Sequence, residues 1–270
     1  MKTNRFAGII LAGIFLITGI AGFTKDTMKV QAADPIVICI DPGHGGTGGR
    51  NLGAQYNGIS EKQVTLITAN AMKTELEKYD NVKVYLTRTT DKEMSLQARA
   101  DYAKSVGADF LFCLHFNSSV QHDLYGSEVW VSGYGSMYQK GYSFANAEIA
   151  QLQALGIYQR GIKTKLGSQG DYYGILRFAT ADAVPCALIE HCYIDHGVDL
   201  SFLKKTTSYE QLGKADATAA AEYFHLKSAA LGVDYSGYQN VSVAMPAVPV
   251  ADDLTAPEVC TIYSAVYNKK

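Results

Sequence analysis

Short apolar runs alternate with longer amphipathic segments along most of this 270-residue chain, and no other feature constrains its fold more strongly. The runs are rich in β-branched and aromatic residues, which predicts strands over residues 36–40, 82–86, 109–114, 127–131 and 186–190. The segments between them carry helical patterns, which predicts helices over residues 61–79, 95–106, 143–158 and 211–226. This alternation predicts an α/β fold: a single three-layer domain with a mostly parallel, twisted sheet and helices on both faces.

The first of these helices has a start signal in the sequence. Ser60 and Gln63 form the S-x-x-Q pattern of a capping box, in which each side chain bonds to the backbone of the other residue. The helix is therefore predicted to begin at about Glu61.

The N-terminus is predicted to lie outside the folded domain. Lys2 and Arg5 precede an apolar stretch, and the small-residue sequence VQA at Val30–Ala32 is typical of a cleavage site. Residues 1–32 are therefore interpreted as a secretory signal peptide, which predicts a secreted protein with no stable membrane association after cleavage. The alternative is an uncleaved anchor helix, since the apolar stretch is near spanning length.

The folded domain is predicted to span residues 33–230. A proline-containing segment without helical period follows, and residues 231–257 are interpreted as a linker. Residues 258–270 show strand-like alternation but are too short to fold alone. They are interpreted as a C-terminal strand or the start of an incomplete further module.

Composition limits the partners of the chain. Apolar residues make up 47% of it, which suffices for a full core, and the formal net charge is −2. Binding to nucleic acid would call for a basic stripe, so no nucleic acid partner is expected. The chain is expected to be a monomer.

The five cysteines do not suggest a metal cage. Cys39, Cys113 and Cys186 lie in strand-like runs, where free cysteine packs as a small apolar residue. The sequence contains no CxxC pair, and the odd count argues against a disulfide framework in an exported chain. Whether Cys186 and Cys192 form a bridge stays open.

Four acid–base or metal-binding residues fall at one edge of the predicted sheet. His44 follows the first strand, within IDPGHGG, while His115 and Glu190 end two later strands. Glu61 opens the helix after the first strand and so faces the same edge. In α/β sheets functional groups gather at the carboxyl ends of the strands, so these residues are predicted to form one site.

Two histidines and one glutamate form the ligand set of catalytic zinc sites, which keep an open position for water. The same set also suits non-haem Fe(II). Export into an oxidising environment favours zinc, because Fe(II) is harder to keep there.

An ordered set of motifs resembles the zinc-dependent N-acetylmuramoyl-L-alanine amidases of bacterial cell walls. The set comprises IDPGHGG, GISEKQVTL, the stretch from VYLTRTTD to LFCLHFNSS, GSEVWV, and RGIKTKLG with AVPCALIEHCYID. The resemblance implies that residues 33–230 form the zinc amidase catalytic domain. It implies one zinc ion per chain, held by His44, Glu61 and His115, with Glu190 as the catalytic carboxylate.

The resemblance also implies the substrate, peptidoglycan, and the bond, the amide between the muramic acid lactyl group and L-Ala of the stem peptide. A secreted cell-wall hydrolase of the autolysin type is therefore expected. Two alternatives stand beside it: a non-catalytic wall-binding module, and a zinc peptidase acting within the stem peptide.

Further residues near these motifs are candidates for supporting roles. Asp41 is interpreted either as the partner of a ligand histidine or as a turn residue. Arg88 either pairs with a substrate carboxylate or forms a salt bridge with Asp91. Asn117 either donates to the substrate or stabilises a local turn. His191 is where the sequence departs from the family pattern, and it either bonds to the substrate or competes as a ligand.

Overall fold

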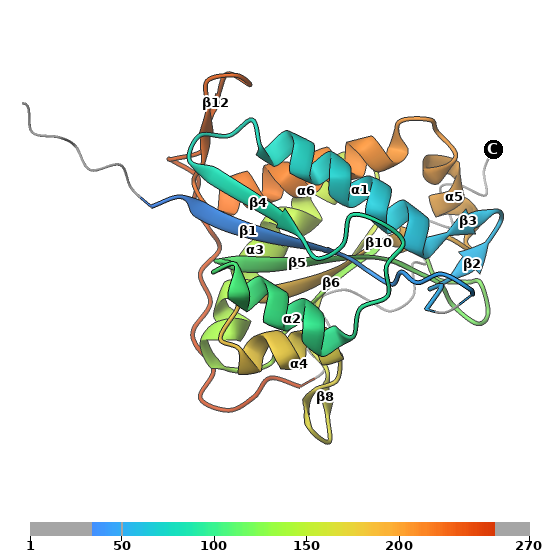
Figure 1. Ribbon diagram of the computed structural model, residues 1–270, viewed down its shortest axis with the longest axis horizontal. Helices are drawn as coiled ribbons and strands as arrows, with labels where there is room; N and C mark the ends of the chain where they lie inside the picture. The colour runs from blue at the N-terminus through green and yellow to red at the C-terminus, as the bar shows by residue number, and fades with distance from the viewer. Residues whose placement is uncertain (1–33, 50, 252–270) are drawn as a thin grey trace, which may run out of the picture. The chain divides into compact units, whose positions relative to one another are not determined.

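The computed structural model describes residues 34–49 and 51–251 (Figure 1). A six-stranded sheet forms the centre of this region, in the order β4-β1-β5-β10-β6-β7. The strands are β1 Ile36–Pro42, β4 Val82–Leu86, β5 Phe110–Asn117, β6 Ser127–Val131, β7 Gln159–Lys163 and β10 Cys186–Tyr193. Strands β4, β1, β5 and β10 pair in parallel, whereas β6 pairs antiparallel with β10 and parallel with β7. The prediction of a mostly parallel sheet is confirmed.

Helices cover both faces of the sheet, as predicted (Figure 1). One face packs against α1 Glu61–Leu76, α3 Gly135–Ala154 and α6 Ser208–Tyr223, and the other against α2 Leu96–Ser105 and α4 Gly174–Ala181. A short helix, α5 Gly197–Leu203, follows β10. Each face has its own apolar core, so the domain has three layers.

Side chains of β5 alternate between the two cores. Phe110, Phe112 and Leu114 pack toward α1, α3 and α6, while Leu111 and Cys113 pack toward α2 and α4. Because successive residues of a strand point to opposite faces, His115 lies on the α2–α4 side at the carboxyl end of β5.

The small elements were not predicted from the sequence. They are three two-residue pairings, β2 Gln55–Tyr56 with β3 Ile59–Ser60, β8 Leu166–Gly167 with β9 Gly170–Asp171, and β11 Lys227–Ser228 with β12 Val233–Asp234. Helix α1 begins at Glu61 as predicted, but the predicted capping box is wrong, because the Ser60 side chain makes no cap hydrogen bond. The Ser60 hydroxyl instead accepts a hydrogen bond from Gln55 Nε2 at 2.8 Å.

Residues 231–251, the described part of the segment interpreted as a linker, run along the domain surface. Val233, Tyr235, Val243 and Val250 pack against the larger core, and the Val250 amide donates to Gly133 O at 2.8 Å. The domain boundary at 230 therefore stays a prediction.

Several expectations concern residues that the structure does not describe. The signal peptide assigned to residues 1–32 and the C-terminal segment 258–270 both lie outside the described residues. Among residues 34–49 and 51–251, no helix has the length and apolar character needed to span a membrane.

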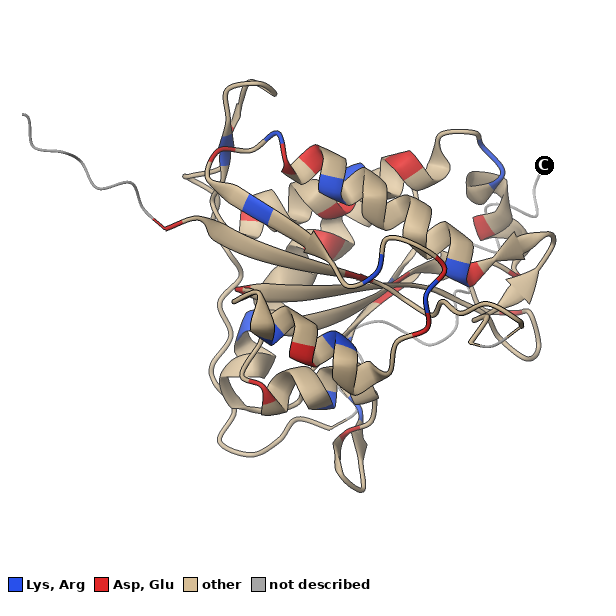
Figure 2. Cartoon of the chain, viewed as in Figure 1, with Lys and Arg blue, Asp and Glu red and all other residues tan. Residues whose placement is uncertain are grey.

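Cys186 and Cys192 are buried free thiols, so the bridge left open by the sequence is not formed. In the view of Figure 2, lysine and arginine are interspersed with aspartate and glutamate over the helices and loops.

Candidate functional site

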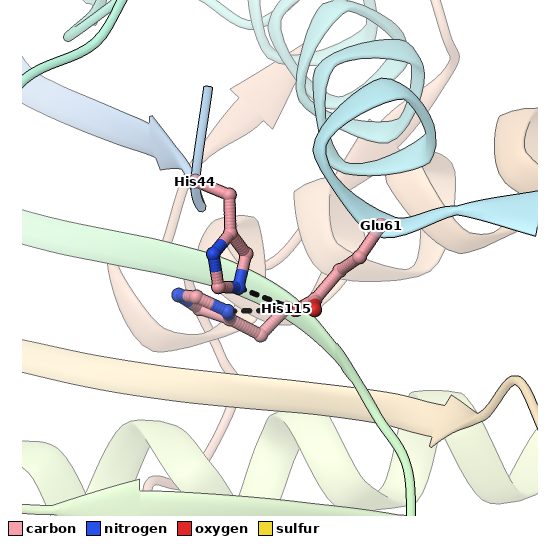
Figure 3. A group of neighbouring side chains, drawn as sticks. All are labelled: His44, Glu61 and His115. Carbon is pink, nitrogen blue, oxygen red and sulfur yellow. Dashed lines mark hydrogen bonds and ion pairs between the residues drawn. The ribbon is translucent and has the colours of Figure 1, made fainter. Parts of the chain in front are cut away.

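Three separate elements bring His44, Glu61 and His115 together at the carboxyl ends of the parallel strands (Figure 3). His44 lies in the loop after β1, Glu61 is the first residue of α1, and His115 lies near the end of β5. Glu190 on β10 is the register partner of His115, so both side chains lie on the same face of the sheet. The four residues therefore lie at one edge of the sheet, as the sequence predicts. Their roles as metal ligands and catalytic carboxylate stay predictions.

Both imidazoles contact one oxygen of the Glu61 carboxylate. His44 Nε2 lies 3.1 Å and His115 Nδ1 2.9 Å from Glu61 Oε1, and the two rings meet edge to face with centroids 4.8 Å apart. One potential ligand atom from each residue lies within 4.8 Å of the others. Three donor atoms of the kinds that zinc prefers therefore share one small volume.

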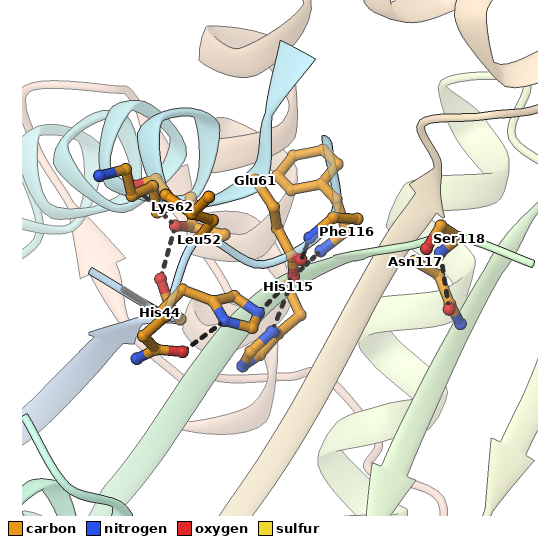
Figure 4. A network of polar contacts seen from close by, with 12 residues as sticks. His44, Leu52, Glu61, Lys62, His115, Phe116, Asn117 and Ser118 are labelled. Atoms are coloured by element: carbon orange, nitrogen blue, oxygen red, sulfur yellow. Dashed lines mark hydrogen bonds and ion pairs between the residues drawn. The ribbon is translucent and has the colours of Figure 1, made fainter. Parts of the chain in front are cut away.

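The Glu61 carboxylate is fixed by backbone amides (Figure 4). Ala54 N donates to Oε2 at 2.7 Å and Phe116 N donates to Oε1 at 3.1 Å. Burial by itself would raise the pKa of Glu61, but the hydrogen bonds with His115 and His44 outweigh it and hold the pKa well below its usual range. Glu61 is therefore an anion in a fixed position.

Two glycines permit the close approach of these side chains. A Cβ on Gly43 would lie 2.4 Å from His115 Cε1, and a Cβ on Gly53 would lie 2.4 Å from Glu61 Oε2. His44 itself has φ of 61°, a left-handed conformation that costs a non-glycine residue energy and persists where the surroundings impose it.

The orientation of His44 is set by Asn51, which the sequence analysis did not identify. His44 Nδ1 lies 3.0 Å from Asn51 Oδ1. Since an amide oxygen only accepts, Nδ1 carries a proton, and Nε2, which faces Glu61, is the nitrogen that can bind a metal ion when the ring is neutral. The chemistry of the donor set and this tautomer fit a zinc ion.

Glu190 lies beside this group in the same cavity. The cavity has a volume of about 560 Å³ and is lined by His44, Gly53, Ala54, Glu61, Leu96, His115, Phe116, Asn117, Ser118, Tyr173, Gly174, Ile175, Leu188 and Glu190. Burial, and then the negative charges of Glu61 and Glu128, raise the pKa of Glu190 well above its usual range. Within the described residues its Oε2 has no hydrogen-bond partner. A carboxyl in this state readily holds a proton.

Asp41 does not contact a ligand histidine, and that interpretation is wrong. Its carboxylate is buried, Oδ1 accepts from Arg99 Nη1 at 2.7 Å, and Oδ2 accepts from the Cys113 thiol at 3.0 Å. Arg99 also donates to the carbonyl oxygens of Pro42 and His44. Asp41 therefore anchors the loop that carries His44 through Arg99.

Arg88 is also occupied by the protein itself. It is 2% exposed, and its guanidinium donates to backbone oxygens, among them Pro42 O at 2.8 Å and Gly43 O at 2.7 Å. The salt bridge with Asp91 is not found, because Asp91 pairs with Lys62 at 2.6 Å. These bonds indicate that Arg88 shapes the turn at Gly43. They argue against the alternative role, in which Arg88 pairs with a substrate carboxylate.

His191 lies on the opposite face of the sheet from Glu190. Adjacent residues of a strand point to opposite faces, so His191 enters the core between β10 and α6, where its Nε2 lies 3.0 Å from Asp216 Oδ1. The expectation that it contacts substrate or competes as a ligand at this site is therefore wrong.

Asn117 lines the cavity, and its contacts are local. Its Oδ1 accepts from Ser118 N at 2.9 Å and its Nδ2 donates to Glu128 Oε1 at 3.1 Å. These contacts favour the turn role over donation to substrate.

Glu128 was missed by the sequence analysis, although it is the register partner of Glu190. Its buried carboxylate accepts hydrogen bonds at 2.6–3.1 Å from the side chains of Asn117, Trp130, Arg160 and Lys163. Strand β6 runs antiparallel to β10, so the start of β6 lies at the site edge. The sequence of a single strand does not indicate whether the strand runs parallel or antiparallel to its neighbours.

A mostly parallel α/β sheet whose edge carries two imidazoles, a carboxylate and a further buried carboxyl is typical of metal-dependent hydrolases. Comparison with known proteins narrows this class. The family model "N-acetylmuramoyl-L-alanine amidase" matches residues 38–222, and the chain belongs to this family.

The similar proteins include two from bacilli. The chain is 33% identical over 193 residues to the N-acetylmuramoyl-L-alanine amidase CwlM of Bacillus licheniformis, covering 71% of this chain and 70% of that protein. It is 33% identical over 197 residues to the sporulation-specific N-acetylmuramoyl-L-alanine amidase of Bacillus subtilis. This match covers 71% of this chain and 69% of that protein.

Among solved structures, the catalytic domain of CwlV, an N-acetylmuramoyl-L-alanine amidase from Bacillus (Paenibacillus) polymyxa var. colistinus, superposes with a TM-score of 0.59 at 25% identity. The match covers 71% of this chain and 99% of that one.

Proposed function

We propose that the chain carries out the amidase reaction of its family with one zinc ion held by His44, Glu61 and His115, and with Glu190 as the proton carrier. The observation that carries this proposal is the convergence of three ligand-type atoms within 4.8 Å in a cavity that Glu190 also lines. A bound zinc ion would polarise the scissile carbonyl and lower the pKa of a water molecule toward neutrality.

Glu190 supplies the proton transfers. It removes a proton from the attacking water as the water oxygen bonds to the amide carbon. It then gives this proton to the departing nitrogen as the carbon–nitrogen bond breaks. An amide nitrogen leaves poorly unless it is protonated, so one carboxyl that acts twice suffices. The raised pKa of Glu190 suits the second step, in which it must donate.

The scissile bond is the amide between the lactyl group of muramic acid and L-Ala of the stem peptide, and the substrate is peptidoglycan. Leu96, Tyr173 and Ile175 form apolar and aromatic walls of the cavity beside Glu190. Such walls can pack the methyl groups of lactate and alanine while polar groups orient the amide.

The chain is further proposed to be exported by residues 1–32 and to act on the cell wall as a monomer, with no nucleic acid partner. The basic residues, apolar stretch and VQA site at the N-terminus support export.

The test is product analysis on purified peptidoglycan, with metal analysis of the wild type beside the Glu190→Gln and His115→Ala variants. We expect new L-Ala amino ends with intact glycan chains from the wild type. Glu190→Gln should retain zinc at this site and lose roughly 10²-fold or more of the rate, and His115→Ala should lose the zinc ion of this site.

Other outcomes would overturn the proposal. New amino ends elsewhere in the stem would indicate a peptidase, and sedimentation with walls without release would indicate a binding module. Unchanged turnover by Glu190→Gln would remove that residue from its role.

A further inference from the structure

A second group of metal-ligand side chains lies on the other face of β10 from Glu190. Glu148 on α3, His191 on β10 and Asp216 on α6 are each 0% exposed, and one potential ligand atom from each lies within 4.8 Å of the others. None of the three lines the cavity of the amidase site. Their burial between two helices and the sheet requires that their charges be balanced within the group.

The hydrogen bonds of His191 fix which ring nitrogen is free. Its Nδ1 lies 3.0 Å from the backbone oxygen of His115, and a carbonyl can only accept, so Nδ1 carries a proton. Its Nε2 faces Asp216, at 3.0 Å from Oδ1 and 3.1 Å from Oδ2. In a neutral imidazole this Nε2 is an acceptor, so a lone pair and a carboxylate would oppose each other unless a cation lies between them.

Glu148 supplies a second observation that points to a missing cation. Both of its carboxylate oxygens are buried, and neither has a hydrogen-bond partner within residues 34–49 and 51–251. A protonated Glu148 that donates to Asp216, beside an imidazolium, would also balance the charge, but it would leave the other buried oxygen of Glu148 without a partner. A dication beside Asp216, ionised Glu148 and neutral His191 gives a neutral group and satisfies all three side chains.

We propose that Glu148, His191 and Asp216 hold a second divalent transition-metal ion, separate from the amidase site. An imidazole with two carboxylates suits zinc, and a ligand histidine whose other nitrogen donates to a backbone carbonyl is the usual arrangement around such ions. Ligand atoms of a tetrahedral zinc site lie about 3.3 Å apart, close to the separation between His191 Nε2 and the Asp216 oxygens.

The position of this site suggests what the ion does. It connects α3 and α6 to β10 directly behind Glu190, and His191 also bonds to the backbone of His115. The ion therefore supports the strands that carry the amidase site. Since its ligands are fully buried, it is released only when the domain opens locally, more slowly than an ion in the solvent-accessible cavity.

The test is zinc stoichiometry of the purified chain after dialysis, with the rate of release to a chelator. The wild type is expected to bind two ions, and Glu148→Gln and His44→Ala one each. The ion left in His44→Ala should leave roughly tenfold or more slowly than the ion left in Glu148→Gln. The matched control is Glu222→Gln on α6, which should keep both ions.

His44→Ala keeps the buried trio intact, so the test does not depend on the folding of the Glu148→Gln variant. A His44→Ala variant without bound zinc would overturn the second site. The second site would also be overturned if Glu148→Gln bound as many zinc ions per chain as the wild type. Failure of the amidase-site proposal looks different, because His44→Ala would then bind as much zinc as the wild type.

Discussion

At the scale of single residues, Gly43 and Gly53 determine how closely the proposed zinc ligands approach one another. We expect Gly43→Ala to lower zinc affinity by roughly 10–100-fold, because the added Cβ would collide with the His115 ring and displace it. Zinc titration against a competing chelator measures this change.

The control for this prediction is Gly197→Ala, where an added Cβ has no heavy atom within 4 Å. That variant should bind zinc as the wild type does. Equal affinities for all three proteins would show that the position of the His115 ring is not set by this contact.

Single residues also show how far sequence reasoning reached. The grouping of His44, Glu61, His115 and Glu190 was predictable, because strand ends and a helix start share one edge of a parallel sheet. The hydrogen-bond partner of His44 was not predictable, because Asn51 lies in an irregular loop with no periodic pattern. Placing His191 beside Glu190 was an error of reasoning, since strand alternation sends neighbouring residues to opposite faces.

At the scale of elements, Arg99 connects α2 to the end of β1. Arg99 and Asp41 are each 1% exposed and bond at 2.7 Å, and Arg99 Nη2 also donates to His44 O at 2.6 Å. Arg99→Met leaves a buried carboxylate without its cation, so we expect the free energy of unfolding to fall by about 3–5 kcal/mol. Urea unfolding monitored by circular dichroism measures this loss.

The same helix offers a matched control. Lys104 pairs with Asp182 at 2.9 Å, but its side chain is 61% exposed. Lys104→Met should change the free energy of unfolding by less than about 1 kcal/mol. Equal effects of the two substitutions would contradict the structural role given to Arg99.

Strand direction and the short elements account for most of what the sequence did not reveal. Five of the six strands of the main sheet were recognised by composition, but β7 was not, and β6 gives no local sign that it pairs antiparallel with β10. The buried Glu128 cluster depends on that pairing and on side chains from β7, so it could not be derived from any one segment. The two-residue strands are too short for a periodic signal.

The segment after α6 gives a second prediction at this scale. Gln139 Nε2 donates to Val243 O at 2.8 Å, and Val250 N donates to Gly133 O at 2.8 Å; neither contact involves a residue that lines the amidase cavity. A chain ending at Leu231 should therefore keep its kcat and KM. It should lose roughly 2–4 kcal/mol of stability from exposed apolar surface, seen as a lower Tm in calorimetry. A large loss of kcat would connect the segment to catalysis.

At the scale of the whole molecule, Asp199 makes global stability depend on pH. Burial, only partly offset by hydrogen bonds from Gly126 N and Tyr193 N, raises the pKa of Asp199 from 3.8 to about 7. Between these two values the folded state binds more protons than the unfolded state. The contribution of Asp199 to stability is therefore fully present below about pH 4 and is lost as the pH rises through about 7.

Asp199→Asn keeps an oxygen that can accept both amide bonds but removes the titration. The free energy of unfolding of the wild type, relative to this variant, should decrease from pH 4 to pH 8 by up to roughly 4 kcal/mol. Denaturant unfolding at four or five pH values measures this difference, in which the titrations of all other groups cancel. A difference between wild type and Asp199→Asn that is independent of pH would mean that Asp199 stays ionised in the folded protein.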